Sequence, residues 1–217
     1  MKKWTKYCFY GFWLFLIGSI FGYFFEGLLE VLKHGIWVSR PGLIYGPLSQ
    51  VYGIGFVVIA ATLYKIKNPI YLFLTGTVVG GTVEYILSLM QEYIFGTISW
   101  DYSEYFLNIN GRTSLFHAIC WGIISFVFMK LCFPMMMSLI HKLENTWGIW
   151  ITIILSILLA IDIFLSVVAA IRQDERKYLI PPRNEFEHFI DKHYPDERMD
   201  AIYSNKKYRH EKNYGQP

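Results

Sequence analysis

The sequence predicts an all-α membrane protein, a polytopic bundle of about five transmembrane helices followed by a polar tail. Apolar residues make up 54% of the 217 residues and aromatic residues 18%, which is more than an ordinary soluble domain carries. Residues 172–217 hold 10 of the 20 lysines and arginines and 9 of the 17 acidic residues. We therefore expect a transmembrane domain over residues 1–171, a tail over 172–217, and a multi-pass location in the cell membrane.

Five apolar stretches have about the length that a helix needs to cross a bilayer core, roughly 20 residues. They cover residues 7–32, 46–64, 69–91, 113–133 and 147–171. Aromatic residues that favour the headgroup level lie near the ends of these stretches: Trp4, Tyr7, Trp37, Tyr64, Trp100, Trp147 and Trp150. The first stretch is longer than the apolar core of a secretory signal and lacks a small-residue cleavage site, so it should stay as a helix.

Basic residues near the ends of the spans predict the orientation, because cytoplasmic segments carry an excess of lysine and arginine. With the N-terminus inside, the connections after the first and third spans face outward, and Pro134–Thr146 is the one inner loop long enough to dock a partner. Five spans would put the tail outside, yet Arg172, Arg176 and Lys177 directly follow the last span and favour the cytoplasm. The sequence leaves the side of the tail open.

Two of the expected helices share the pattern Gly-x-x-x-Gly-x-x-x-Glu. It occurs as Gly18, Gly22 and Glu26 and again as Gly76, Gly80 and Glu84. A spacing of four puts these residues on one face, where glycines let helix backbones approach closely. The pattern favours a parallel repeat of a helix pair, with the first two spans corresponding to the next two. Simple helix packing is the alternative interpretation of the glycines.

Four carboxylates lie well inside the predicted spans: Glu26, Glu30, Glu84 and Asp162. An ionisable residue at the centre of a bilayer costs about 2.5–3.5 kcal/mol on insertion scales, so such a residue is usually paired, protonated or functional. A purely structural bond to an arginine or a backbone amide is the alternative.

Both outer connections contain glycines and the first also contains prolines, which permit non-helical backbone at membrane depth only where protein or a water-filled cavity covers it. Their candidate substrate- or ion-binding residues are Arg40, Trp100, Asp101, Tyr102, Asn108, Asn110 and Arg112, with His117 about one turn inside the fourth span. Together they predict a polar cavity that opens outward. Two folded loops, anchored by aromatic residues and internally hydrogen-bonded, are the alternative.

The glutamates of the repeated pattern should meet these loop residues. Glu26 and Glu84 lie one turn beyond Gly22 and Gly80, so we expect them to converge on a shared site with Arg112 and His117. Pairing with Arg112 would keep at least one of the two carboxylates ionised.

Several function classes are excluded or given no support. The chain has no Gly-x-x-x-x-Gly-Lys-Ser/Thr phosphate loop, so it does not hydrolyse ATP by that route. Its cysteines and histidines are not spaced as a metal site, and neither a metal nor a cofactor is expected. A net charge of +3 without a basic stripe makes nucleic acid an improbable partner.

The order of several short motifs resembles a known family. These motifs are Glu26-Gly27-x-x-Glu30, Gly42-x-x-x-Gly46-Pro47, Tyr52-Gly53, Glu84-Tyr85, Trp100-Asp101-Tyr102-Ser103 and Asn108-x-Asn110-Gly111-Arg112. Over roughly residues 10–140 the chain resembles the bacterial family labelled "putative ABC-transporter permease, type IV". The resemblance implies a small polytopic membrane protein in which these acidic, aromatic and Asn-Gly-Arg positions are functional. It implies no substrate, and it gives no support to Asp162.

Three hypotheses about function follow. The first is a permease subunit that moves a small substrate, for which a cation is one candidate, and that works with a separate ATPase chain or as a homo-oligomer in the lipid bilayer. The second is an intramembrane enzyme that uses carboxylates, His117 and Arg112 for acid–base chemistry on a lipid or lipid-linked substrate. The third is a non-catalytic scaffold or sensor whose tail binds a partner.

Overall fold

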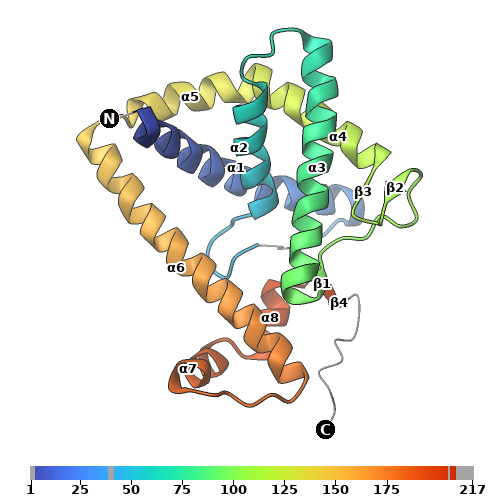
Figure 1. Ribbon diagram of the computed structural model, residues 1–217, viewed down its shortest axis with the longest axis vertical. Coiled ribbons are helices and arrows are strands. Elements are labelled where there is room, and N and C mark those ends of the chain that lie inside the picture. Colours follow the sequence, from blue (N-terminus) through green and yellow to red (C-terminus); the bar gives the residue numbers. More distant parts are fainter. Residues whose placement is uncertain (1–2, 39–41, 205, 209–217) are drawn as a thin grey trace.

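The computed structural model describes residues 3–38, 42–204 and 206–208, and the chain in these ranges is mostly helical (Figure 1). The long helices are α1 (Lys3–His34), α2 (Gln50–Leu63), α3 (Pro69–Phe95), α4 (Leu115–Val127), α5 (Phe133–Lys142) and α6 (Thr146–Lys177). Many of their apolar side chains are exposed, as is usual for helices that face lipid. The protein is an all-α membrane bundle, as the sequence predicts.

Four helices in the described part of the chain are long and apolar enough to cross a membrane: α1, α3, the continuous helix Leu115–Lys142, and α6. Helix α2 is shorter than the span expected over 46–64, because its first expected turn is not helical. Gly46 has a φ of +81° and Pro47 follows it, and neither residue continues a helix there. At 1.5 Å per residue, α2 is about 21 Å long, against a bilayer core of about 30 Å.

Helices α4 and α5 are joined by a π-helical turn, Phe128–Cys132, which ends just before Pro134. Such a turn shifts the hydrogen-bond ladder, so the missing N–H of a proline is tolerated inside a long helix. The expected inner loop Pro134–Thr146 was therefore wrong. Residues 133–142 are helical, and only residues 143–145 connect them to α6.

The two helix pairs α1–α2 and α3–α4 pack through matching positions. A Cβ on Gly22 would meet the Tyr52 side chain at 2.3 Å, and a Cβ on Gly80 would meet Trp121 at 2.4 Å. The same correspondence holds for Gly53, which lies against Ser19 and Phe15, and for Gly122, which lies against Thr77 and Phe73. Equivalent contacts at equivalent positions support the expected repeat of a helix pair.

The main apolar core lies between α1, α2 and the α4–α5 helix. Phe56 stacks on Phe128 with the ring centroids 4.2 Å apart, and Ile59 and Leu63 are fully buried beside them. Helix α6 diverges from this core toward the tail, as Figure 1 shows.

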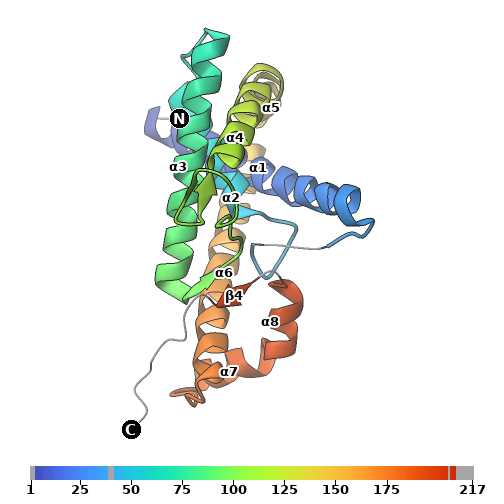
Figure 2. The same ribbon diagram turned by 90° about the vertical axis from the view of Figure 1, so that its right-hand side faces the viewer.

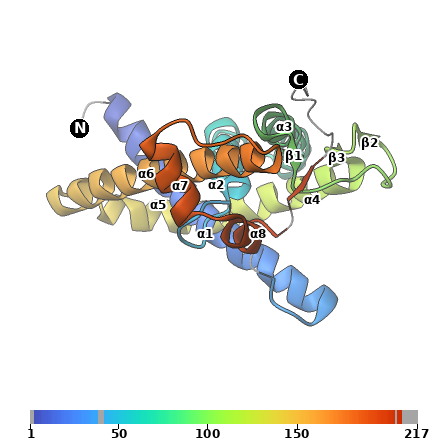
Figure 3. The same ribbon diagram turned by 90° about the horizontal axis from the view of Figure 1, so that it is seen from below.

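The tail is folded against the C-terminal half of α6. It forms α7 (Glu185–His193), α8 (Asp196–Ile202) and the short strand β4 (Lys207–Tyr208), and β4 pairs antiparallel with β1 (Thr97–Ile98) at the end of α3. A second small hairpin joins β2 (Asn108–Ile109) to β3 (Thr113–Ser114). Figure 2 shows α7 and α8 at the end of the molecule opposite the α2–α3 connection, and Figure 3 shows that end from below, with α7 and α8 in front.

A buried ion-pair network fixes the tail. The Arg172 side chain is 2% exposed and pairs with Asp191 at 2.7 Å and with Glu175 at 2.6 Å. Arg176 also pairs with Asp191. Burial acts to raise the pKa of Asp191, but hydrogen bonds from Arg172 and Arg176 outweigh that effect and lower it. The tail is thus an ordered cap on α6.

Candidate functional site

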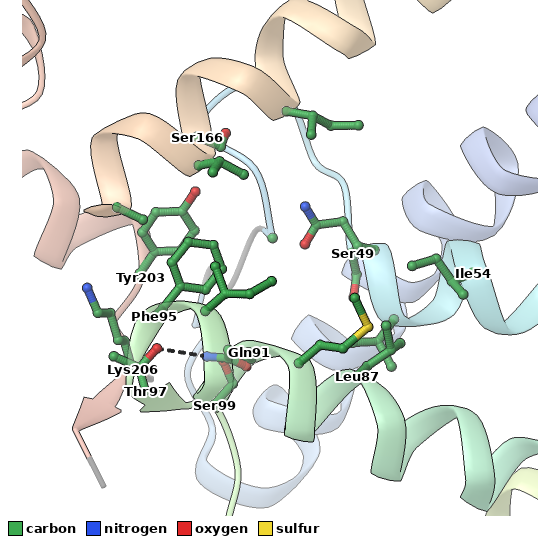
Figure 4. Close-up of a pocket in the computed structure, with 18 of the residues that line it drawn as sticks. Ser49, Ile54, Leu87, Gln91, Phe95, Thr97, Ser99, Ser166, Tyr203 and Lys206 are labelled. Atoms are coloured by element: carbon green, nitrogen blue, oxygen red, sulfur yellow. Dashed lines mark hydrogen bonds between the residues drawn. The ribbon is translucent and has the colours of Figure 1, made fainter. Parts of the chain in front are cut away.

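A cavity of about 450 Å³ lies between α2, α3, α6 and the tail. Its polar lining residues are Glu26, Ser49, Gln50, Gln91, Thr97, Ser99, Trp100, Ser166, Tyr203 and Lys206. Figure 4 shows Gln91, Thr97 and Ser99 together on one wall, with Tyr203 and Lys206 beside them. Gln91 donates to Ser99 at 2.9 Å and to Thr97 at 3.3 Å, and these bonds fix that wall.

The tail closes one side of this cavity. Lys206 donates to Gln173 at 2.8 Å, and burial lowers the pKa of its ammonium group in spite of three nearby aspartates. Tyr203 lies next to Lys206 in the lining, and burial raises the pKa of its phenol to about 12. The Tyr203 phenol therefore stays protonated and can donate a hydrogen bond near neutral pH.

The non-helical segment before α2 forms another part of the lining because it is bonded to α6. The Ile44 amide donates to Ser166 Oγ at 2.9 Å, and the Tyr45 amide donates to Asp162 Oδ1 at 3.2 Å. Ser166 also donates to Asp162 at 3.2 Å. The intramembrane carboxylate Asp162 thus accepts bonds that hold a backbone segment, which favours the structural interpretation of this residue.

Glu84 lies in the interior of the bundle rather than toward lipid. Its side chain is 6% exposed, one turn beyond the contact of Gly80 with Trp121. Tyr102 donates to Glu84 Oε1 at 3.3 Å, and the side chains of Thr113 and Trp121 face the same carboxyl group. The other oxygen, Oε2, is buried and has no hydrogen-bond partner in the described part of the chain.

Tyr102 links Glu84 to His117. The Tyr102 ring stacks on the His117 imidazole at a centroid distance of 3.5 Å and an interplanar angle of 10°. His117 Nδ1 lies 2.8 Å from Ser114 Oγ, and Ser114 also caps α4. Burial and the nearby Glu84 charge raise the pKa of Tyr102, so its phenol remains a donor at neutral pH.

Glu26 approaches the same region from α1. Glu26 lies one turn beyond Gly22, which packs against Tyr52, and the Tyr52 ring contacts Trp121 at a centroid distance of 5.6 Å. Tyr52 was missed as a candidate, although it belongs to the Tyr-Gly motif that contributes to the family resemblance. Glu26, Tyr52, Glu84, Tyr102 and Trp121 are called the paired-glutamate site below.

Arg112 does not join this site in the expected way. It is 8% exposed and pairs with Glu92, and its guanidinium also lies 3.4 Å from Ser88 Oγ. The expected pairing of Arg112 with Glu26 or Glu84 was therefore wrong. Glu84, Ser88 and Glu92 follow one another at intervals of four on a single face of α3, and Arg112 reaches that face two turns beyond Glu84.

The other loop candidates mainly fold the loop itself. Trp100 donates to the Arg112 carbonyl at 2.9 Å, and Asp101 accepts from the Ser103 amide at 2.9 Å. Asn108 donates to two loop carbonyls, and Asn110 donates to the Tyr85 hydroxyl at 3.0 Å. These bonds agree with the interpretation of the region as a folded, internally bonded loop.

The two remaining candidates are Glu30, on α1, and Arg40, in the first connection. Glu30 Oε2 lies 3.9 Å from His34 Nε2 on the same helix, further along α1 than Glu26. Arg40 lies outside the described residues.

A comparison with known families gives one match. The family model described as "Putative ABC-transporter type IV" matches residues 13–167, more than two-thirds of the chain. The match extends beyond the region of roughly 10–140 that the motifs suggested, and it includes Asp162 on α6. No curated protein and no solved structure matches the chain.

Proposed function

We propose a function from one premise: the chain belongs to the family described as "Putative ABC-transporter type IV". It is a membrane protein of the transporter type, with long apolar helices. The proposal is that this chain forms the membrane-spanning permease subunit of a transporter for a small substrate. Because its sequence has no phosphate-loop motif, ATP hydrolysis would take place on a separate chain.

The observation that carries this proposal is a buried acidic residue inside the helix bundle, together with a cavity that a second acidic residue lines. Glu84 is 6% exposed inside the bundle, and such residues within membrane proteins commonly mark the path of a substrate or ion. Glu26 lines the 450 Å³ cavity, and it lies one turn beyond Gly22 on α1 as Glu84 lies one turn beyond Gly80 on α3. A substrate would therefore pass from the cavity, by way of Glu26, to Glu84.

Within this proposal the loop residues have a positioning role. The interlocked loop around Trp100 and Arg112 holds Tyr102 against Glu84 and His117. We expect the cavity to open on the side of the membrane where this loop lies.

The test is purification of the full chain from its native membrane together with the products of neighbouring ATPase genes. A stable complex whose ATPase activity falls with Glu84→Gln, but not with Glu104→Gln, would support the permease. Glu104 is an exposed loop residue and serves as the matched control. Repeated failure to find any ATPase in the complex would overturn the proposal. A lipid species that changes both on deletion and in a Glu84→Gln strain would instead favour the intramembrane enzyme.

A further inference from the structure

We propose that the paired-glutamate site binds a small organic ammonium ion, with Glu26 and Glu84 as equivalent ligands from the two halves of an internal repeat. The inference rests on the proposed function for its physiological meaning, because it names the class of substrate. Binding itself can be measured without any transport partner.

The equivalence of the two glutamates follows from the packing of the helix pairs. Each glutamate lies one turn beyond a glycine that contacts an aromatic ring of the next helix, Gly22 against Tyr52 and Gly80 against Trp121. The two rings are themselves equivalent, and they touch each other. The halves therefore meet at corresponding residues, and transporters built from parallel repeats bind substrates at such an interface.

The charge of the site favours a cation. Glu84 is buried with Oε2 unpartnered, and in the described part of the chain no lysine or arginine forms an ion pair with it. Arg112, the nearest expected partner, is committed to Glu92. A buried carboxyl group ionises only when an opposite charge and hydrogen-bond donors lie beside it, and an ammonium group supplies both.

The walls of the site favour an organic ammonium ion over a hard metal ion. The side chains of Tyr102 and Trp121 lie at the Glu84 carboxyl group, the Tyr52 ring contacts Trp121, and aromatic rings attract ammonium groups. Calcium and magnesium ions prefer a shell of several oxygen ligands instead. The Glu84 carboxylate would repel phosphate or carboxylate ligands.

Access is provided by the cavity that Glu26 lines. That cavity has a volume of about 450 Å³, and its lining is mixed, with Ser49 and Gln50 beside apolar residues such as Phe15 and Ile54. An ion with apolar substituents fits such a lining better than a strongly hydrated one.

The experiment is equilibrium binding to the purified full chain in nanodiscs, followed by tryptophan fluorescence or calorimetry. The probes are choline, tetramethylammonium, and 3,3-dimethylbutan-1-ol, which has the shape of choline without its charge. We expect choline to bind at least about tenfold more tightly than the neutral alcohol. Glu84→Gln and Glu26→Gln should each weaken choline binding by at least about tenfold, whereas Glu104→Gln should leave it unchanged.

Equal affinities for choline and the neutral alcohol, or no binding of either cation to the unmodified chain, would overturn the inference. So would choline binding that survives Glu84→Gln in a folded protein. If the glutamate variants do not fold, the comparison of choline with the neutral alcohol on the unmodified chain still tests whether the site prefers a cation. If choline does not bind, the proposed permease function is not contradicted. If no ATPase partner is found, the proposed binding of an ammonium ion is not contradicted.

Discussion

The Tyr102 ring stacks on the His117 imidazole with the centroids only 3.5 Å apart, and this contact joins the loop after α3 to the first turn of α4. The hydroxyl of the same tyrosine donates to Glu84 on α3. One loop residue therefore contacts both helices of the second pair. A movement of the loop would change the environment of the buried carboxylate directly.

Removal of the Tyr102 hydroxyl should weaken the site without unfolding it. Tyr102→Phe keeps the ring stacked on His117 but takes away a donor to Glu84, so we expect a loss of stability on the order of 1 kcal/mol and weaker choline binding. The check is thermal unfolding in detergent together with the binding assay. Tyr105→Phe is the control, since the Tyr105 side chain is exposed. Equal effects of the two variants would contradict this role.

The partner of Arg112 can be identified by a double-mutant cycle. Arg112→Ala removes a cation that pairs with the mostly buried Glu92 carboxylate, so it should destabilise the protein by about 3 kcal/mol or more. The coupling free energy should be larger for Arg112→Ala combined with Glu92→Gln than for Arg112→Ala combined with Glu84→Gln. Unfolding in denaturant measures both. A larger coupling with Glu84 would restore the pairing expected from the sequence.

The fold class and the helix faces could be predicted from the sequence because they depend on local patterns. Hydropathy identifies helices long enough for a bilayer, and a spacing of four assigns Gly22 and Gly80 to packed faces. The partner of Arg112 could not be predicted in this way. A sequence pattern gives the face of a helix, but the height at which a loop side chain reaches that face depends on how the loop folds.

The structures of the tail and of the α4–α5 helix also could not be predicted from local sequence patterns. Interleaved charges predict a polar tail, but pairs such as Arg172 with Asp191 join positions that only the folded chain brings together. Pro134 suggested a break after the fourth span, whereas the π-helical turn before it lets the helix continue. The sequence pattern placed Glu84 on a packed face of α3, where it is buried, whereas Glu26 is only partly buried and Tyr52 was overlooked.

The close packing of Gly22 and Gly80 can be tested by comparing their alanine variants with an alanine variant of Gly11 on α1. Gly22→Ala would place a Cβ 2.3 Å from Tyr52 Cγ, and Gly80→Ala would place one 2.4 Å from Trp121 Cβ. These atoms lie close to the backbone of α2 and α4 and cannot rotate away, so both variants should lower the unfolding temperature. At Gly11 nothing lies within 4 Å of the added Cβ, and alanine there should be neutral or stabilising by up to about 1 kcal/mol. Similar effects at all three positions would argue against close packing.

The end of the bundle where α5 connects to α6 should lose stability in acid. Hydrogen bonds from Tyr10, His141 and Lys6 lower the pKa of Glu144 to about 2 from 4.5. A depressed carboxyl pKa means that the stabilisation is present above pH 4.5 and is lost as the pH falls from 4.5 toward 2. Unfolding temperatures should therefore differ between the unmodified chain and Glu144→Gln at pH 6, and the difference should shrink in acid. A difference in unfolding temperature that stays constant from pH 6 into acid would show that ionisation of Glu144 does not stabilise the fold.

The last prediction concerns the side of the membrane on which the tail lies, which the sequence leaves open. Strand β4 of the tail pairs with β1 at the end of α3, so the tail and the loop after α3 must share one side. The α2–α3 connection lies at the other end of α3 and should face the opposite side (Figure 1).

In a background without Cys8, Cys120 and Cys132, we expect Glu104→Cys and Ser204→Cys to react with a membrane-impermeant maleimide from the same side. Lys67→Cys, in the α2–α3 connection, should react only from the other side. All three replaced positions are exposed, so a lack of labelling reports the side and not burial. Labelling of the Glu104 and Ser204 positions from opposite sides would show that the tail is not attached to α3 in the membrane, and the cavity that Tyr203 and Lys206 close would then be open.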